Sequence, residues 1–226
     1  MTVGELLMQG GWPMVPIYLC SAVAVAIFCR KLVQYRAEGL SRTAWLDDVL
    51  RSLEESRIGD ARERVAQTDH PIARVVGVML ATRDRRPDRV EAEARRAGSL
   101  EVQRLEHHVG ALSFIAQAAP LLGLLGTVIG MVELFMSLQG AGLTNVDAGL
   151  LAAGIWKALL TTAAGLVVAV PTLAAYSYLH SRTDAFRLTL RDAVERVLTA
   201  LPAPDPTDGL ADPPRPQLVR EASGGV

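Results

Sequence analysis

The chain has 226 residues, a formal net charge of −1 and a hydrophobic content of 50%. Its basic residues, mostly Arg, alternate with Asp and Glu, which argues against a nucleic-acid-binding surface. The sequence contains no Cys-x-x-Cys pair, phosphate-binding glycine loop or nucleophile elbow, so we expect neither an enzyme nor a cofactor.

The placement of charge divides the chain into membrane-spanning and water-exposed parts. No Lys or Arg precedes Arg30, and none lies between Val109 and Trp156. Three charge-poor stretches result, and each approaches or exceeds the roughly 20 apolar residues that cross a bilayer. The predicted transmembrane helices are residues 12–29, 109–139 and 146–179.

The basic flanks of these stretches predict their orientation, because Lys and Arg accumulate on the cytoplasmic side. Arg30 and Lys31 follow the first span, Arg104 precedes the second and Arg182 follows the third. The N-terminus is therefore predicted to lie outside. The water-exposed parts are an outer segment (1–11), a cytoplasmic helical domain (30–108), a short outer loop (140–145) and a cytoplasmic C-terminal region from residue 180.

The N-terminal stretch reads as a membrane anchor rather than a cleavable signal peptide. It lacks a basic leading region, and Arg30 with Lys31 closes it like a stop signal. Cys20 and Cys29 lie nine residues apart on this helix, roughly 13 Å by helical rise. That separation is too large for a disulfide between them.

The cytoplasmic block is predicted to be helical and to have only a small core of its own. Residues 41–56 place apolar side chains on one helical face, and 58–67 and 71–82 are shorter candidate helices. Residues 90–108 are predicted to run unbroken into the second span. The adjacent His107 and His108 point in different directions on a helix, so no metal site is expected.

The third span and the C-terminal region contain two further signals. Pro171 lies within the span and is expected to kink its helix. Residues 180–201 have apolar side chains at helical spacing and are predicted to form a cytoplasmic amphipathic helix. Residues 202–226 are rich in proline and are predicted to be a disordered tail.

The polar groups inside the second and third spans are candidate functional residues, because ionisable groups in a membrane are costly. If Thr127 and Thr162 lie level, Glu133 lies roughly 9 Å further out and Lys157 roughly 7.5 Å further out. We therefore expect Glu133 and Lys157 to pair, within or between subunits. The alternative is that each extends separately to the outer interface.

Small residues recur in the same two spans and permit close helix packing. Gly126 and Gly130 form a Gly-x-x-x-Gly motif, which indicates packing rather than a particular function. The glycines expected at helix contacts are Gly123, Gly126, Gly130, Gly154 and Gly165.

Two segments carry a family resemblance. The stretches APLLGLLGTVIGMVELF (119–135) and AAGIWKALLTTAAGLVVAVPT (152–172) resemble the MotA/TolQ/ExbB proton-channel family, and most closely its ExbB branch. The resemblance implies an all-α, multi-pass protein of the bacterial inner membrane that assembles as a pentameric helical pore. It also implies a single-span ExbD- or TolR-like partner inside that pore and a TonB-like protein that couples proton flow to outer-membrane transport.

The resemblance places the family's two pore threonines on Thr127 and Thr162. It also identifies a departure at Lys157, because ExbB and TolQ proteins typically carry a glutamate there, in a GI-x-E-AL pattern. Glu133 in turn stands where ExbB-like sequences often have a neutral polar residue. Three functions therefore stay open: an ExbB-type motor subunit, a TolQ-type or other stator-like subunit, and a non-conducting membrane scaffold.

Overall fold

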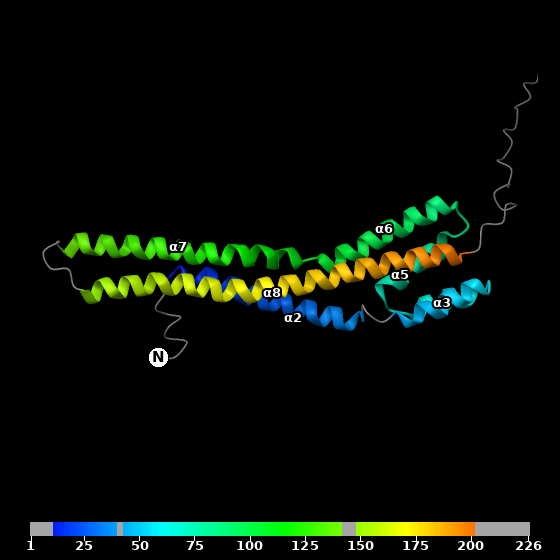
Figure 1. Ribbon diagram of the computed structural model, residues 1–226, viewed down its shortest axis with the longest axis horizontal. Helices are drawn as coiled ribbons and strands as arrows, with labels where there is room; N and C mark the ends of the chain where they lie inside the picture. The colour runs from blue at the N-terminus through cyan, green and yellow to red at the C-terminus, as the bar shows by residue number, and fades with distance from the viewer. Residues whose placement is uncertain (1–10, 40–42, 142–147, 202–226) are drawn as a thin grey trace, which may run out of the picture. The chain divides into compact units, whose positions relative to one another are not determined.

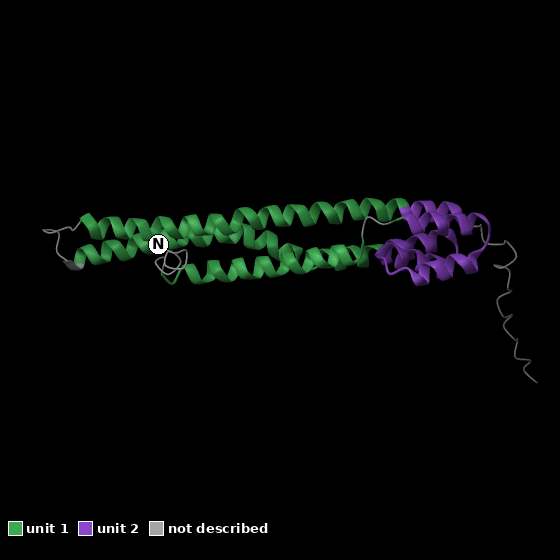
Figure 2. Ribbon diagram, turned by 90° about the horizontal axis from the view of Figure 1, so that it is seen from below, with its two compact units in different colours: residues 1–43, 98–192 green, residues 44–97, 193–226 purple. Residues whose placement is uncertain are grey.

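A computed structural model describes residues 11–39, 43–141 and 148–201 of the chain. All the regular secondary structure in these residues is helical. This confirms the predicted all-α class. The helices are α2 (Met14–Ala37), α3 (Ala44–Glu54), α4 (Ile58–Gln67), α5 (Pro71–Thr82), α6 (Pro87–Glu106), α7 (Val109–Ala141) and α8 (Ala148–Ala200) (Figure 1). Two compact units divide the chain: residues 1–43 with 98–192, and residues 44–97 with 193–226 (Figure 2).

Among the residues that the structure describes, three helical segments are long and apolar enough to cross a membrane, as the sequence predicts: Met14–Ala37 (α2), Pro87–Gln139 (which contains most of α7) and Ala148–Ala200 (α8). Apolar side chains point outward along all three, and Val128, Phe135 and Val167 are each more than half exposed. Such a surface is stable only against lipid or another protein chain. Residues 142–145 of the predicted outer loop, the Pro-rich tail and nearly all of the outer N-terminal segment lie outside the described residues, whereas residues 140–141, predicted to begin the loop, are the last residues of α7.

The helix predicted to run unbroken into the second span is interrupted, so that prediction is wrong. Helix α6 ends at Glu106 and α7 begins at Val109. His107 and His108 form a turn between them, and His108 adopts a left-handed φ of 70°. A non-glycine residue persists in this region only when surrounding contacts hold it there.

Side chains of α2 provide the contacts that stabilise this break. The Lys31 ammonium donates to the backbone oxygens of Leu105 (2.9 Å) and Arg104 (3.3 Å), and the Tyr35 hydroxyl lies 3.2 Å from the Leu105 oxygen. These are carbonyls that the end of α6 leaves without helical partners, and a cation is favourable at that end. Tyr35 also bonds the buried Thr183 hydroxyl on α8 at 2.7 Å.

The second unit has a small apolar core of its own. Leu46, Val49 and Leu53 on α3 are buried, which confirms the apolar face predicted for this helix. The predicted bounds of α4 and α5 match the structure. Helix α5 starts sharply because Pro71 fixes its first turn and the His70 ring nitrogen Nδ1 accepts from the Ile72 amide at 3.1 Å.

Helix α8 is continuous over 53 residues, roughly 80 Å of helical rise. It joins the predicted third span and the predicted cytoplasmic helix without a break. Pro171 lies inside it, where the missing amide leaves the Val167 carbonyl without its usual helical donor. A kink at Pro171 stays a prediction.

Candidate functional site

Glycines bring α7 and α8 into close contact within the predicted spans. A Cβ atom at Gly126 would lie 2.7 Å from the Thr161 Cβ and Oγ1 atoms, and one at Gly165 would lie 2.5 Å from the Ala119 backbone oxygen. Side chains are not tolerated at these separations, so this packing requires glycine. Gly123, Gly130 and Gly154 also face the neighbouring helix at short distance.

The same contacts define the relative height of the two threonines predicted to face a pore. Gly126 of α7 lies directly against Thr161 of α8. Thr127 and Thr162 are the next residues along these two helices. Because the helices rise only about 1.5 Å per residue, these two positions lie within about one helical turn of each other in height.

The Thr161 and Thr162 hydroxyls bond across the helix interface to one carbonyl. Their oxygens lie 3.4 Å and 3.1 Å from the Gly123 backbone oxygen. Thr161 is buried and also donates to Ala158 at 2.7 Å, whereas Thr162 is half-buried at the edge of the interface. Thr161 is thus a packing residue that the sequence analysis left without a role. The only indication of this role in the sequence was that Thr161 carries a hydroxyl directly before Thr162.

Thr127 also bonds to a backbone oxygen, in this case within its own helix. Its hydroxyl donates to the Leu124 oxygen at 2.6 Å, and the side chain is half-buried. The contacts described for the two helices include none between Thr127 and Thr162. A threonine oxygen whose proton is donated can still accept a hydrogen bond. Both residues can therefore accept from a water molecule or from a protonated carboxylic acid on another chain.

Glu133 and Lys157 form an ion pair between α7 and α8. The Lys157 Nζ atom lies 2.9 Å from the Glu133 Oε2 atom. The side chains are 48% and 37% exposed, so the pair lies at the edge of the interface rather than in its centre. Each charge neutralises the other, which lowers the cost of holding both within apolar helices.

Gly11 lies against this ion pair, a contact that was not predicted from the sequence. It precedes α2 with a left-handed φ of 73°, and a Cβ atom there would lie 2.9 Å from Lys157 Cε and 3.1 Å from Nζ. Glycine is the residue that adopts this backbone conformation without strain. No local pattern in the sequence indicates that residue 11 lies close to residue 157.

No group of three or more metal-binding side chains occurs among the residues that the structure describes. His107 and His108 contact each other, with their Nδ1 atoms 2.6 Å apart. One of these nitrogens must donate and the other accept, so the pair is a local hydrogen bond at the turn.

A family model supports the resemblance carried by the two spans. The model of the MotA/TolQ/ExbB proton channel family matches residues 66–192, which include α7 and most of α8. The matched region contains both threonines, the ion pair and the packing glycines.

Relatives in several organisms extend the similarity over most of the chain. A biopolymer transport protein ExbB homolog from Methanothermobacter thermautotrophicus is 31% identical over 81% of this chain. The matched region spans 64% of that relative's length. Biopolymer transport protein exbB1 of Vibrio cholerae is 30% identical over 75% of each chain. The Tol-Pal system protein TolQ of Haemophilus influenzae is 36% identical over 45% of this chain and 43% of its own. With its helical spans and its polar α7–α8 interface, the chain belongs to the MotA/TolQ/ExbB proton channel family.

Proposed function

We propose that this protein is an ExbB-like subunit of a motor driven by the proton-motive force in the bacterial inner membrane. In this proposal, a pentamer surrounds single-span helices of an ExbD-like partner, whose membrane aspartate carries the proton. Proton flow then drives a TonB-like protein that energises transport across the outer membrane. The N-terminus lies outside and residues 30–108 lie in the cytoplasm, in agreement with the positions of the basic flanks.

The observation that supports this function most directly is the threonine pair on α7 and α8. Thr127 and Thr162 lie at similar heights in predicted spans that also hold the paired Glu133 and Lys157. A hydroxyl can bond a passing carboxylic acid or a water without adding a fixed charge. It therefore suits the wall of a path along which a partner's carboxyl group gains and loses a proton.

Replacing either threonine by valine is expected to reduce proton flux. Thr127→Val and Thr162→Val keep the side-chain shape and remove the hydroxyl, so each should lower partner-dependent flux by about tenfold, the effect of losing one hydrogen bond worth about 1.4 kcal/mol at the rate-limiting step. The measurement is acid influx into liposomes that contain the protein with its single-span partner, under an imposed membrane potential.

Thr189→Val is the matched control, because this threonine lies on the same helix beyond the predicted span and bonds the Ala185 oxygen of its own helix. It should leave flux unchanged. If both the Thr127 and the Thr162 variant conduct protons at the wild-type rate, neither residue lies on the proton path.

Two other functions make different predictions in the same assay. A TolQ-type subunit would conduct with a TolR-like partner and support envelope integrity rather than TonB-dependent uptake. A non-conducting scaffold is favoured by one observation, namely that Lys157 holds the place of the usual glutamate and is neutralised by Glu133. Wild-type protein that assembles with its partner and conducts no protons would establish the scaffold.

A further inference from the structure

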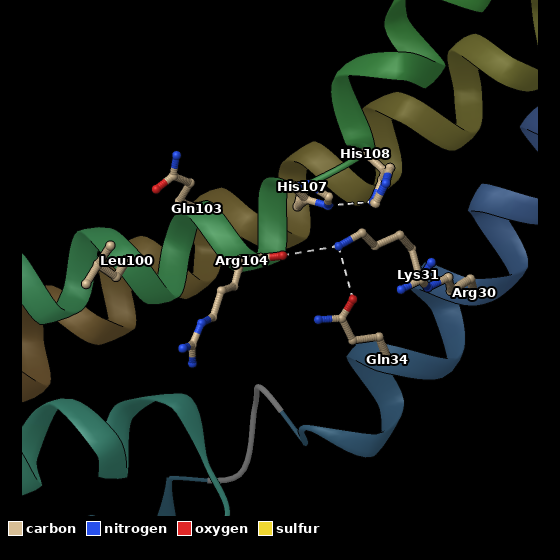
Figure 3. Close-up of a pocket in the computed structure, with 8 residues that line it drawn as sticks. All are labelled: Arg30, Lys31, Gln34, Leu100, Gln103, Arg104, His107 and His108. Atoms are coloured by element: carbon tan, nitrogen blue, oxygen red, sulfur yellow. Dashed lines mark hydrogen bonds between the residues drawn. The ribbon is translucent and has the colours of Figure 1, made fainter.

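Basic side chains from two distant parts of the sequence meet around one cavity. Arg30 and Lys31 directly follow the first predicted span, and His107 and His108 directly precede the second. The packing of α2 against α7 brings these flanks together. A cavity of about 630 Å³ lies between them (Figure 3). Its polar lining includes Arg30, Lys31, Gln34, Arg104, His107 and His108.

The lining of this cavity is positively charged. No Asp or Glu lines it in the part of the chain that the structure describes. Lys31 is buried, and its ammonium group donates hydrogen bonds to the Gln34 side chain and to the backbone oxygens of Arg104 and Leu105 at the end of α6 (Figure 3). Arg104 has a 3.0 Å ion pair with Glu101, one helical turn back on α6, and stays mostly exposed. The cavity therefore presents cationic charge that its own lining does not cancel.

Arg30 is the residue best placed to bind a ligand. It is exposed, and within the described ranges its guanidinium makes no hydrogen bond or ion pair. A guanidinium offers donors in a fixed fork that matches two oxygens of a phosphate. The imidazoles of His107 and His108 lie on the other side of Lys31 and add further ring nitrogens (Figure 3).

The depth of the cavity indicates the source of the anion. Its basic residues lie within a few positions of the ends of two apolar spans, which is the level of lipid headgroups rather than of bulk water. Basic pockets between membrane helices on the cytoplasmic side bind the headgroups of anionic lipids. We propose that this cavity binds the phosphate of an anionic phospholipid headgroup, with Arg30 as its principal ligand. The proposal depends on the placement of α2 and α7 in the membrane and not on proton conduction.

Neutralising Arg30 should weaken anionic lipid binding selectively. For the purified chain in neutral detergent, we expect saturable binding of dioctanoyl phosphatidylglycerol, followed by native mass spectrometry. Arg30→Gln should raise the Kd about fivefold, the effect of one basic residue at a lipid surface. Arg36→Gln is the matched control: it removes an exposed arginine of the same helix outside the cavity and should leave the Kd unchanged.

Two further ligands test the source of the phosphate. Dioctanoyl phosphatidylcholine, which has a phosphate but no net charge, should bind at least about fivefold more weakly than phosphatidylglycerol. Inorganic phosphate at the same concentrations should not displace the bound lipid. The proposal is wrong if the two lipids bind equally, if Arg30→Gln behaves like wild type, or if inorganic phosphate competes on equal terms. A far-ultraviolet circular dichroism spectrum confirms that each variant is folded.

Discussion

Replacing Gly165 by alanine should lower the melting temperature of the protein by several degrees. The added methyl carbon would lie 2.5 Å from the Ala119 backbone oxygen and 3.1 Å from the Gly123 Cα atom. Backbone atoms cannot rotate away as a flexible side chain can, so α7 and α8 must separate. Overpacking of this kind costs about 1–3 kcal/mol, and the lost contact along the glycine seam adds to that cost. Thermal unfolding in detergent measures the change, at about 2–4 °C for each kcal/mol.

Gly110→Ala separates this packing effect from the general effect of placing alanine in a helix. Gly110 belongs to α7 and a Cβ atom there would meet nothing within 4 Å. Alanine has the higher helix propensity, so this control should be neutral or slightly stabilising. Gly165→Leu should be worse than Gly165→Ala. Equal melting temperatures for Gly165→Ala and Gly110→Ala would mean that the helices do not pack as described.

Reversing one charge of the Glu133–Lys157 pair should destabilise the protein more than reversing both. Glu133→Lys places two ammonium groups about 3 Å apart within the spans, and the uncompensated charge should cost on the order of 3 kcal/mol. Lys157→Glu should cost less, because two adjacent carboxyls can share a proton. The double variant restores an ion pair and should recover most of the loss, as measured by melting temperature and by the monodisperse fraction in detergent.

An exposed ion pair of the second unit provides the control. Arg64 and Asp48 lie 3.0 Å apart with side chains about half exposed to solvent. Reversing them singly or together should change stability by no more than about 0.5 kcal/mol, because water screens such pairs. A double variant at Glu133 and Lys157 that is no better than either single variant would exclude a stabilising pair.

The features that could be predicted from the sequence are those that depend on composition, on local signals and on the constant rise per residue of a helix. The spans follow from the distribution of Arg and Lys, because a bilayer excludes charge over a known thickness. The proximity of Glu133 and Lys157 follows from two antiparallel helices with a common rise per residue. Helices α4 and α5 were delimited by local signals, such as the proline that begins α5.

The parts that sequence reasoning missed depend on contacts between distant residues. Nothing in the local sequence interrupts a helix at His107 and His108, and the contacts that cap α6 there come from Lys31 and Tyr35 on α2. The position of Gly11 against Lys157 likewise depends on how α2 packs. Such features need the tertiary arrangement, which periodicity and propensity do not provide.

The turn at His107 and His108 has a mechanical consequence. A helix resists bending and twisting because every turn is braced by backbone hydrogen bonds, and α8 keeps this bracing from the membrane span onward apart from the one donor missing at Pro171. Between α6 and α7 the helix is interrupted by a turn at His107 and His108, although the His107 amide still donates to the Gln103 oxygen at 3.0 Å. Torsional strain applied to the second span is therefore expected to concentrate at this joint, whereas strain applied to the third span is passed along α8. The chain thus has a compliant connection and a stiff one leading from two of its predicted spans.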